Sequence, residues 1–299
     1  MTYDFDVQIS ELGVDAEAAI EDLFKRSLGG RPIIECAYGT PAGWDDIAAG
    51  GWDMVGAAED DGGAGLGIRD LISLAMVVGR WVPPLPVLET IMAKRWSSAA
   101  RESEGPVTVA IRTESGRILA PFGETPGISV LVDANPPDGA IAAPTIVAAD
   151  DYAPSLRLVE SDRASAISVE QAHELAVVWA AEAAGCAKRT LEIAVDYVKQ
   201  RNQFGQPVGR FQAVKHHLAD ALMSSQESES AVFWAASDAP KLAPALEIVF
   251  DSALRTAEIA TQAHGGMGFT WELGLHVYLR QIVALRQLAM SLAAIVDAG

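Results

Sequence analysis

The C-terminal part of the chain carries four long segments with helical periodicity, separated by short links. The segments are 168–200, 211–235, 241–263 and 271–296. Their apolar residues recur three and four positions apart, as on the buried face of a helix. Ser168 and Gln171 are spaced as a capping box at the start of the first segment. Because short links make consecutive helices run antiparallel, these segments predict a four-helix bundle.

The rest of the chain divides into a helical region and a small region of strands. Periodic apolar positions predict helices over 14–26 and 68–81. Short β-branched runs at 107–111 and 128–132, with weaker ones at 146–147 and 156–159, predict strands. We therefore expect a mainly α fold with a small β middle domain. The expected domains are a helical N-terminal domain (1–105), a shortened β domain (106–165) and a C-terminal four-helix bundle (166–299).

Charge and composition exclude several classes of protein. The 40 acidic against 22 basic residues give a net charge of −18, whereas a nucleic-acid or anionic-membrane binder needs a basic surface. No segment reaches 18 uncharged apolar residues, so we expect no membrane insertion. The two cysteines, Cys36 and Cys186, are too few for a disulfide framework and suggest a reduced compartment. The acidic N-terminus is unlike a secretory leader, and we expect a cytoplasmic protein.

Two sequence patterns that could suggest a ligand site are weak. The run from Gly62 to Gly67 is rich in glycine, but Ile68 stands where a dinucleotide loop needs its last glycine. We interpret this run as the entry to a helix. His216 and His217 are adjacent, so they point to different faces of a helix, and we expect no metal site.

A basic stretch interrupts the acidic chain between the first two bundle segments. It contains six bases and two acids: Lys188, Arg189, Lys199, Arg201, Arg210 and Lys215, with Glu192 and Asp196. These bases could simply complement the negative C-terminal end of a helix dipole. Alternatively, Arg201 and the N–H groups of the loop could bind an anion such as a pyrophosphate. Composition alone leaves both interpretations open.

Two motifs in the bundle resemble those of a known family. The sequence RNQFGQPVGRFQAVKHHLAD at 201–220 is similar to a motif of flavin-dependent acyl-CoA dehydrogenases. The sequence QAHGGMGF at 262–269, followed by Glu272 and Arg280, resembles a second motif of that family, and the stretch 51–66 is similar to its N-terminal domain. The resemblance covers nearly the whole chain. It implies a helical N-terminal domain, a middle β-barrel and a C-terminal four-helix bundle.

The resemblance also implies a set of cofactor-binding residues. In this family the bundle motifs hold the FAD of a neighbouring subunit. Arg201 would contact the pyrophosphate, Phe204 would pack near the flavin, and Gln212 would hydrogen-bond the cofactor. Gln262 with Gly265 and Gly266 would lie along the ribose and the pyrophosphate. Gln203 and Gly205 complete the implied set, because they flank Phe204 in the first motif.

The sequence departs from the family pattern where the chemistry takes place. The family's flavin-lining segment, of the type Leu-Thr-Glu-Pro-x-x-Gly-Ser-Asp, has no counterpart between 106 and 165. The family's base is a carboxylate, but its two usual positions are occupied here by Ala289 and Leu175. Glu174 is one residue from the second position, which is about 100° around a helix. The catalytic residue is therefore left unassigned.

These features together imply a short subunit of an acyl-CoA dehydrogenase. A longer partner subunit would supply the flavin-facing barrel and the base, in a heterodimer or in a heterotetramer with two chains of each kind. The resemblance implies an acyl-CoA substrate, for which we expect a steroid-derived acyl group, and an electron-transfer flavoprotein as acceptor. Two alternatives remain: a self-sufficient homo-oligomeric dehydrogenase that uses Glu174, and a flavin-free structural subunit.

Overall fold

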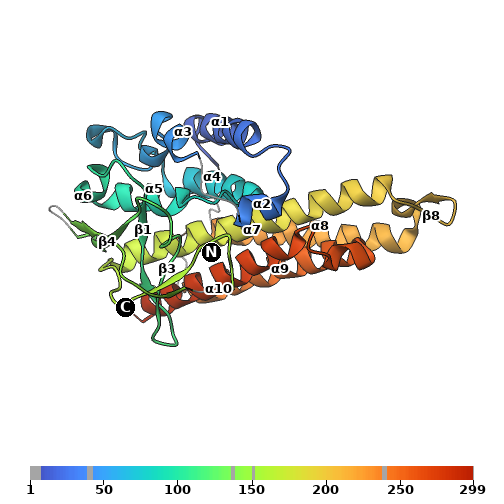
Figure 1. Ribbon diagram of the computed structural model, residues 1–299. Coiled ribbons are helices and arrows are strands. Elements are labelled where there is room, and N and C mark those ends of the chain that lie inside the picture. Colours follow the sequence, from blue (N-terminus) through green and yellow to red (C-terminus); the bar gives the residue numbers. More distant parts are fainter. Residues whose placement is uncertain (1–7, 39–42, 136–138, 150–151, 238–240, 299) are drawn as a thin grey trace.

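The N-terminal unit of the protein is helical. The computed structural model describes residues 8–38, 43–135, 139–149, 152–237 and 241–298. The acidic N-terminal sequence that we compared with a secretory leader lies mostly outside these residues. The helices of this unit are α1 (Glu11–Ser27), α2 (Ile33–Tyr38), α3 (Trp44–Ala49), α4 (Ile68–Trp81), α5 (Val87–Trp96) and α6 (Ser98–Arg101). In Figure 1 they form a layer along one side of the long bundle helices.

The glycine-rich run is a helix-entry loop, as the sequence predicts. It ends at Gly67, the N-cap residue of α4. The carboxylate of Asp70 accepts hydrogen bonds from the backbone N–H of Gly67 at 3.2 Å and of Ser10 at 2.8 Å. Because Ser10 is the N-cap of α1, this one side chain ties the start of α1 to the start of α4.

The described residues of the middle unit form seven short strands in two sheets. They are β1 (Val107–Val109), β2 (Ile111–Arg112), β3 (Ile118–Ala120), β4 (Ser129–Asp133), β5 (Ala140–Ala142), β6 (Ile146–Ala149) and β7 (Val159–Ser161). The sheet orders are β1-β4-β5 and β2-β3-β7-β6. The last strand begins at Val159 rather than at residue 156, because Arg157 has a φ of 44° and breaks the extended run.

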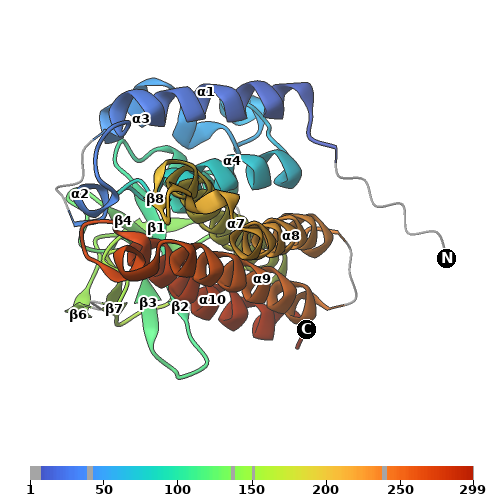
Figure 2. The ribbon, with the colours of Figure 1, turned by 90° about the vertical axis from the view of Figure 1, so that its right-hand side faces the viewer.

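Four antiparallel helices form the C-terminal bundle. They are α7 (Val169–Gln200), α8 (Gln212–Ala235), α9 (Leu242–Ala263) and α10 (Leu275–Val296), and Figure 2 looks down the bundle. Ser168 and Gln171 form the predicted capping box of α7. The last helix begins four residues later than predicted, because its N-cap Gly274 has a φ of 70°. The mainly helical fold with a small β middle unit is confirmed.

The helix α10 is the one described helix that is long and apolar enough to cross a membrane. Half of its most apolar window is buried inside the protein. Its buried residues include Tyr278, Leu285 and Leu292, which belong to the main hydrophobic core. The apolar composition of α10 is therefore explained by its packing within the bundle.

The N-terminal unit contacts the bundle through two glycines. A Cβ atom on Gly79 of α4 would lie 1.9 Å from the carbonyl oxygen of Glu182 in α7. A Cβ atom on Gly185 of α7 would lie 2.0 Å from the carbonyl oxygen of Met76 in α4. The two helices therefore cross with their backbones in contact, which only glycine permits at these positions.

Candidate functional site

The loop between α7 and α8 is a tight hairpin with an exposed aromatic residue at its turn. Its strands are β8 (Asn202–Gln203) and β9 (Gln206–Pro207). The two turn residues, Phe204 and Gly205, have φ values of 53° and 80°. Two positive values are typical of a type I′ turn, which is uncommon for a bulky residue. The Phe204 side chain is 92% exposed, so the turn presents an aromatic ring to the outside.

Arg201 stands at the base of this hairpin. Its backbone N–H donates to the carbonyl oxygen of Tyr197 at 2.8 Å, and its own carbonyl oxygen accepts from the N–H of Val208 at 2.8 Å. The backbone of Arg201 is thus fixed by hydrogen bonds on both sides, while the residue is exposed. No ion pair joins its guanidinium group to a described residue. It is therefore available to an anion.

Half of the bases in the basic stretch are neutralised within the chain. Lys188 pairs with Glu229 at 3.1 Å, Arg189 with Glu192 at 3.1 Å, and Lys199 with Asp196 at 3.6 Å. Arg201, Arg210 and Lys215 form no ion pair with described residues, and all three are exposed. The positive charge that remains is concentrated on the hairpin and the first turn of α8.

The second motif forms a short 3-10 helix, η4 (Gly265–Phe269), directly after α9. Gly265 has a φ of 59°, in the left-handed region that favours glycine. A Cβ atom on Gly265 or Gly266 would meet nothing within 4 Å, so no internal packing demands glycine at Gly266. The Gly-Gly pair instead leaves an open strip of backbone that a ligand can approach closely.

A ring contact joins the end of α7, just before the first motif, to the second motif. The Tyr197 ring on α7 and the His264 ring at the end of α9 have centroids 4.5 Å apart. His264 is buried, and its Nδ1 lies 2.7 Å from the carbonyl oxygen of Ala260. Its Nε2 is buried without a hydrogen-bond partner among the described residues. Burial lowers the pKa of His264, so the neutral ring packs between the two helices.

The predicted cofactor-binding residues lie on the outer surface of this end of the bundle. All eight are exposed: Arg201, Gln203, Phe204, Gly205, Gln212, Gln262, Gly265 and Gly266. Gln262 also lines a groove of about 390 Å³ between α8 and α9, together with Val214 and His217. Gln212 begins α8, and its Nε2 lies 2.7 Å from the Nε2 of His216. The eight residues thus form an open surface rather than an enclosed pocket.

The positions of the family's base hold no carboxylate, and Glu174 is committed elsewhere. Leu175 and Ala289 are both fully buried in the apolar core. The Glu174 carboxylate lies 3.1 Å from the Nη2 of Arg95 and accepts a 2.7 Å hydrogen bond from the Nε1–H of Trp96. Its side chain is 16% exposed. Glu174 is therefore a mostly buried, fully paired carboxylate near the start of α7.

Sequence reasoning missed two buried carboxyl groups, Glu89 on α5 and Glu182 on α7. Glu89 accepts a 2.9 Å hydrogen bond from the Nε1–H of Trp179, and Glu182 accepts a 2.7 Å bond from the amide of Gln281. Burial raises the pKa of Glu89 to about 7; burial and the charge of Glu89 raise that of Glu182 to about 8. The sequence contains one signal for the burial of Glu182. This residue lies four positions from both Val178 and Cys186, so it shares the apolar face of the helix with them.

Comparisons with known proteins agree with this architecture. Residues 166–289 match the family "Acyl-CoA dehydrogenase, C-terminal domain". The acyl-CoA dehydrogenase FadE34 of Mycobacterium tuberculosis is 34% identical over 83% of this chain, but the chain covers only 41% of that protein. The acyl-CoA dehydrogenase IpdE2 of the same organism is 29% identical, with 88% of each chain covered. The ChsE4-ChsE5 complex of that organism contains a chain that superposes with a TM-score of 0.75 at 20% identity, covering 97% of both chains.

Proposed function

The chain belongs to the acyl-CoA dehydrogenase family, and we propose that it is a subunit of an FAD-dependent enzyme that introduces an α,β double bond into an acyl-CoA thioester. In this proposal the bundle supplies half of the FAD site. A longer partner chain supplies the flavin-facing barrel and the catalytic base. FAD, when bound, provides the acceptor for the hydride that leaves Cβ of the substrate.

The donor set at the bundle end fits a flavin dinucleotide. The unpaired Arg201 guanidinium is suited to the charged oxygens of a pyrophosphate. The open backbone at Gly265 and Gly266 lets phosphate or ribose atoms approach without meeting a side chain. Gln212 and Gln262 offer amide groups to polar atoms of the cofactor, and the exposed Phe204 ring offers an apolar face to its ring system.

The exposure of all eight residues is the observation that carries the proposal. A cofactor held by this surface alone would remain largely in solvent, whereas tight small-molecule sites bury most of their ligand. A second chain laid over the surface would enclose the cofactor. Leu175 and Ala289 also support a partner chain. They are apolar residues at the two positions where the family has its base, and a subunit without a base needs a partner that has one.

The geometry weighs against a self-sufficient enzyme that uses Glu174. A general base must be free to accept a proton from the substrate. The Glu174 carboxylate is held by the guanidinium of Arg95 and by the indole N–H of Trp96. Glu89 and Glu182 are fully buried, and neither lines one of the described cavities, so a substrate has no described path to them.

The remaining parts of the proposal concern the partners. The ChsE4-ChsE5 complex pairs two different chains, which supports a longer dehydrogenase subunit as the partner here. We expect an acyl-CoA with a bulky, steroid-derived acyl group as the substrate and an electron-transfer flavoprotein as the acceptor. We place the assembly in the cytoplasm. These expectations follow from the family resemblance and from the acidic composition of the chain.

Purification of the chain alone and together with a longer dehydrogenase subunit, such as the product of a neighbouring gene, tests the proposal. We expect a colourless isolated chain and a yellow, active complex with flavin absorbance. A yellow and active isolated chain would contradict the need for a partner. A complex that stays colourless and inactive after FAD is added would instead make this chain a structural subunit.

A further inference from the structure

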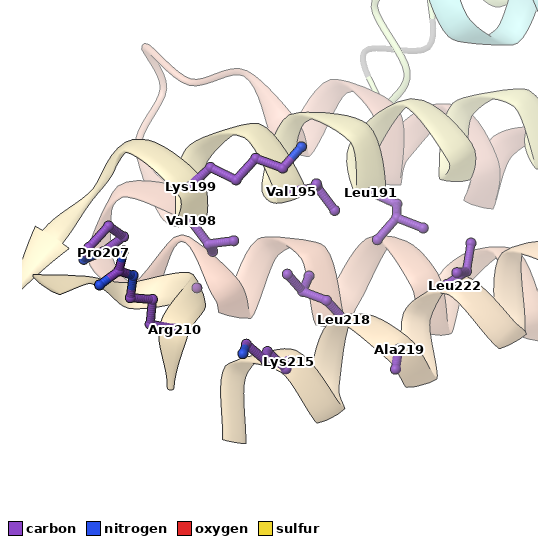
Figure 3. A pocket seen from close by; sticks show the side chains of 11 residues that line it. Leu191, Val195, Val198, Lys199, Pro207, Arg210, Lys215, Leu218, Ala219 and Leu222 are labelled. Atoms are coloured by element: carbon purple, nitrogen blue, oxygen red, sulfur yellow. The ribbon is translucent and has the colours of Figure 1, made fainter. Parts of the chain in front are cut away.

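A second cavity lies beside the hairpin and has no part in the proposed cofactor surface. It is a groove of about 520 Å³ between α7 and α8. Its walls are apolar side chains of both helices: Leu191, Val195 and Val198 on α7, with Leu218, Ala219 and Leu222 on α8. Figure 3 shows these side chains facing the space between the two helices. The apolar wall runs for about 10 Å, the rise of α7 from Leu191 to Val198.

Three cationic residues line the groove, and none of its described lining residues is acidic. They are Lys199, Arg210 and Lys215. Lys199 pairs weakly with Asp196 at 3.6 Å, and both side chains are about two-thirds exposed. Arg210 and Lys215 form no ion pair with described residues. In a chain with 40 acids for 22 bases, two neighbouring unpaired bases are unexpected unless an external anion uses them.

The charges and the apolar side chains are separated along the groove. Arg210 and Lys215 lie at the end next to the hairpin, whereas Leu191, Ala219 and Leu222 lie at the opposite end (Figure 3). Leu222 is 50% exposed although it is apolar, so the far end of the groove is an uncovered hydrophobic wall. This order of charge followed by apolar surface matches a molecule with an anionic head and an aliphatic tail.

We propose that the α7–α8 groove binds an anionic amphiphile, with its head group at Arg210 and Lys215 and its aliphatic chain along Leu191, Val195 and Leu218. Burial of aliphatic surface supplies the attraction, and the two cations select the sign of the head group. A free acyl carboxylate and an acyl-CoA share this chemistry. None of the eight proposed FAD residues lines the groove, so the inference stands independently of the flavin.

Isothermal titration calorimetry below the micellar concentration tests the proposal on the full chain. We expect dodecanoate to bind one site, and dodecyltrimethylammonium, with the same chain and the opposite charge, to bind at least tenfold more weakly. The net charge of −18 favours the cationic amphiphile over most of the surface, so preference for the anion must come from a local basic site, which the variants below locate. Dodecanoyl-CoA in a parallel titration shows whether the thioester binds more tightly than the free acid.

Variants locate the site. The double variant R210Q/K215Q should weaken dodecanoate binding about tenfold or more, and L222D, which adds a carboxylate to the partly exposed wall, should abolish it. The exposed Lys25 and Arg26 on α1 provide a matched control, because K25Q/R26Q also removes two positive charges, far along the chain from the groove. Circular dichroism and size-exclusion chromatography verify that each variant is folded.

Three outcomes would overturn the proposal. The first is equal or stronger binding of dodecyltrimethylammonium. The second is dodecanoate binding that R210Q/K215Q and K25Q/R26Q affect equally, which would place the ligand elsewhere. The third is loss of dodecanoate binding when the longer subunit is bound, because the groove would then be part of a subunit interface. Preserved binding in the assembled complex, lost in L222D, supports a ligand site.

Discussion

Glu174 and Arg95 form an ion pair that joins the start of the bundle to the N-terminal unit. The Nη2 of Arg95 lies 3.1 Å from the carboxylate, and its Nη1 donates to the carbonyl oxygens of Gly56 and Leu66 at 2.9 Å each. Trp96 adds a 2.7 Å hydrogen bond to the same carboxylate. The Glu174–Arg95 pair therefore joins α5, α7 and the loop before α4. This arrangement gives Glu174 a structural role.

Replacement of Glu174 by Gln should affect stability more than catalysis. The amide oxygen keeps an acceptor for Trp96, but the mostly buried Arg95 loses its counter-charge, which should cost on the order of 1–3 kcal/mol of unfolding free energy. Turnover of the assembled enzyme should change less than about threefold, on the order of 0.7 kcal/mol. Urea denaturation and steady-state kinetics measure the two effects.

The exposed Glu170, in the first turn of the same helix, is the matched control, and Glu170→Gln should change neither quantity appreciably. A fall in turnover of a hundredfold or more in Glu174→Gln, with FAD still bound, would show that this chain carries its own base. Such a result would contradict both the structural role and the need for a catalytic partner.

Replacement of Arg201 by Ala should weaken FAD retention in the assembled complex while the subunit stays folded. Loss of a charge-assisted contact to a diphosphate costs on the order of 1.5–3 kcal/mol, or about one to two decades in affinity. Flavin fluorescence during dilution or dialysis of the complex measures this change. Arg26→Ala, at an exposed arginine near the end of α1, should leave retention unaltered. Unchanged FAD affinity in Arg201→Ala with normal assembly would remove the pyrophosphate role.

The buried pair Glu89 and Glu182 should make the protein less stable as the pH rises. Both pKa values are raised in the folded protein, to about 7 and about 8, above the value of about 4.3 for an exposed glutamate. A raised pKa means that the folded state favours the protonated group. The contribution of these two protonated carboxyl groups to the free energy of unfolding is fully present below about pH 4 and is lost as the pH rises through 7 and 8.

The slope is about 1.4 kcal/mol per pH unit for each group that binds its proton only in the folded state. Unfolding free energies measured between pH 5 and pH 9 show this slope. The variant Glu182→Gln keeps an acceptor for Gln281, but its side chain has no proton to lose at this position. Its free energy of unfolding should therefore fall less steeply with pH. An identical pH dependence in Glu182→Gln and in the unmodified protein would show that the pair is not the cause.

Local sequence signals predicted the helices better than the strands. The bounds of α4 follow directly from its apolar spacing and from Pro83, and Ser168 correctly marks the start of α7. The strands β3 and β5 were not expected, because each has only three residues and its stability comes from pairing with distant strands. Tertiary pairing of this kind leaves little trace in a short segment.

The candidate site shows the same division between local and distant information. The motifs around Arg201 and Gly265 could be located in the sequence because their function depends on local backbone conformation. The partners of Glu174 and Glu89 are 79 and 90 residues away along the chain, and no local pattern specifies them. The contact between Tyr197 at the end of α7 and His264 in the second motif also could not be inferred from local sequence.

The contact between α4 and α7 predicts that Gly185→Ala destabilises the protein. Alanine is favoured over glycine inside a helix by about 1 kcal/mol, so helix propensity alone predicts a gain in stability. At Gly185, however, the added Cβ would lie 2.0 Å from the carbonyl oxygen of Met76, and the two helices must move apart. Overpacking of this kind typically costs about 1–3 kcal/mol. The matched control is Gly266→Ala, where a Cβ meets nothing within 4 Å and thermal unfolding should be unaltered. A rise in melting temperature for Gly185→Ala would mean that α4 and α7 are not in backbone contact at this crossing.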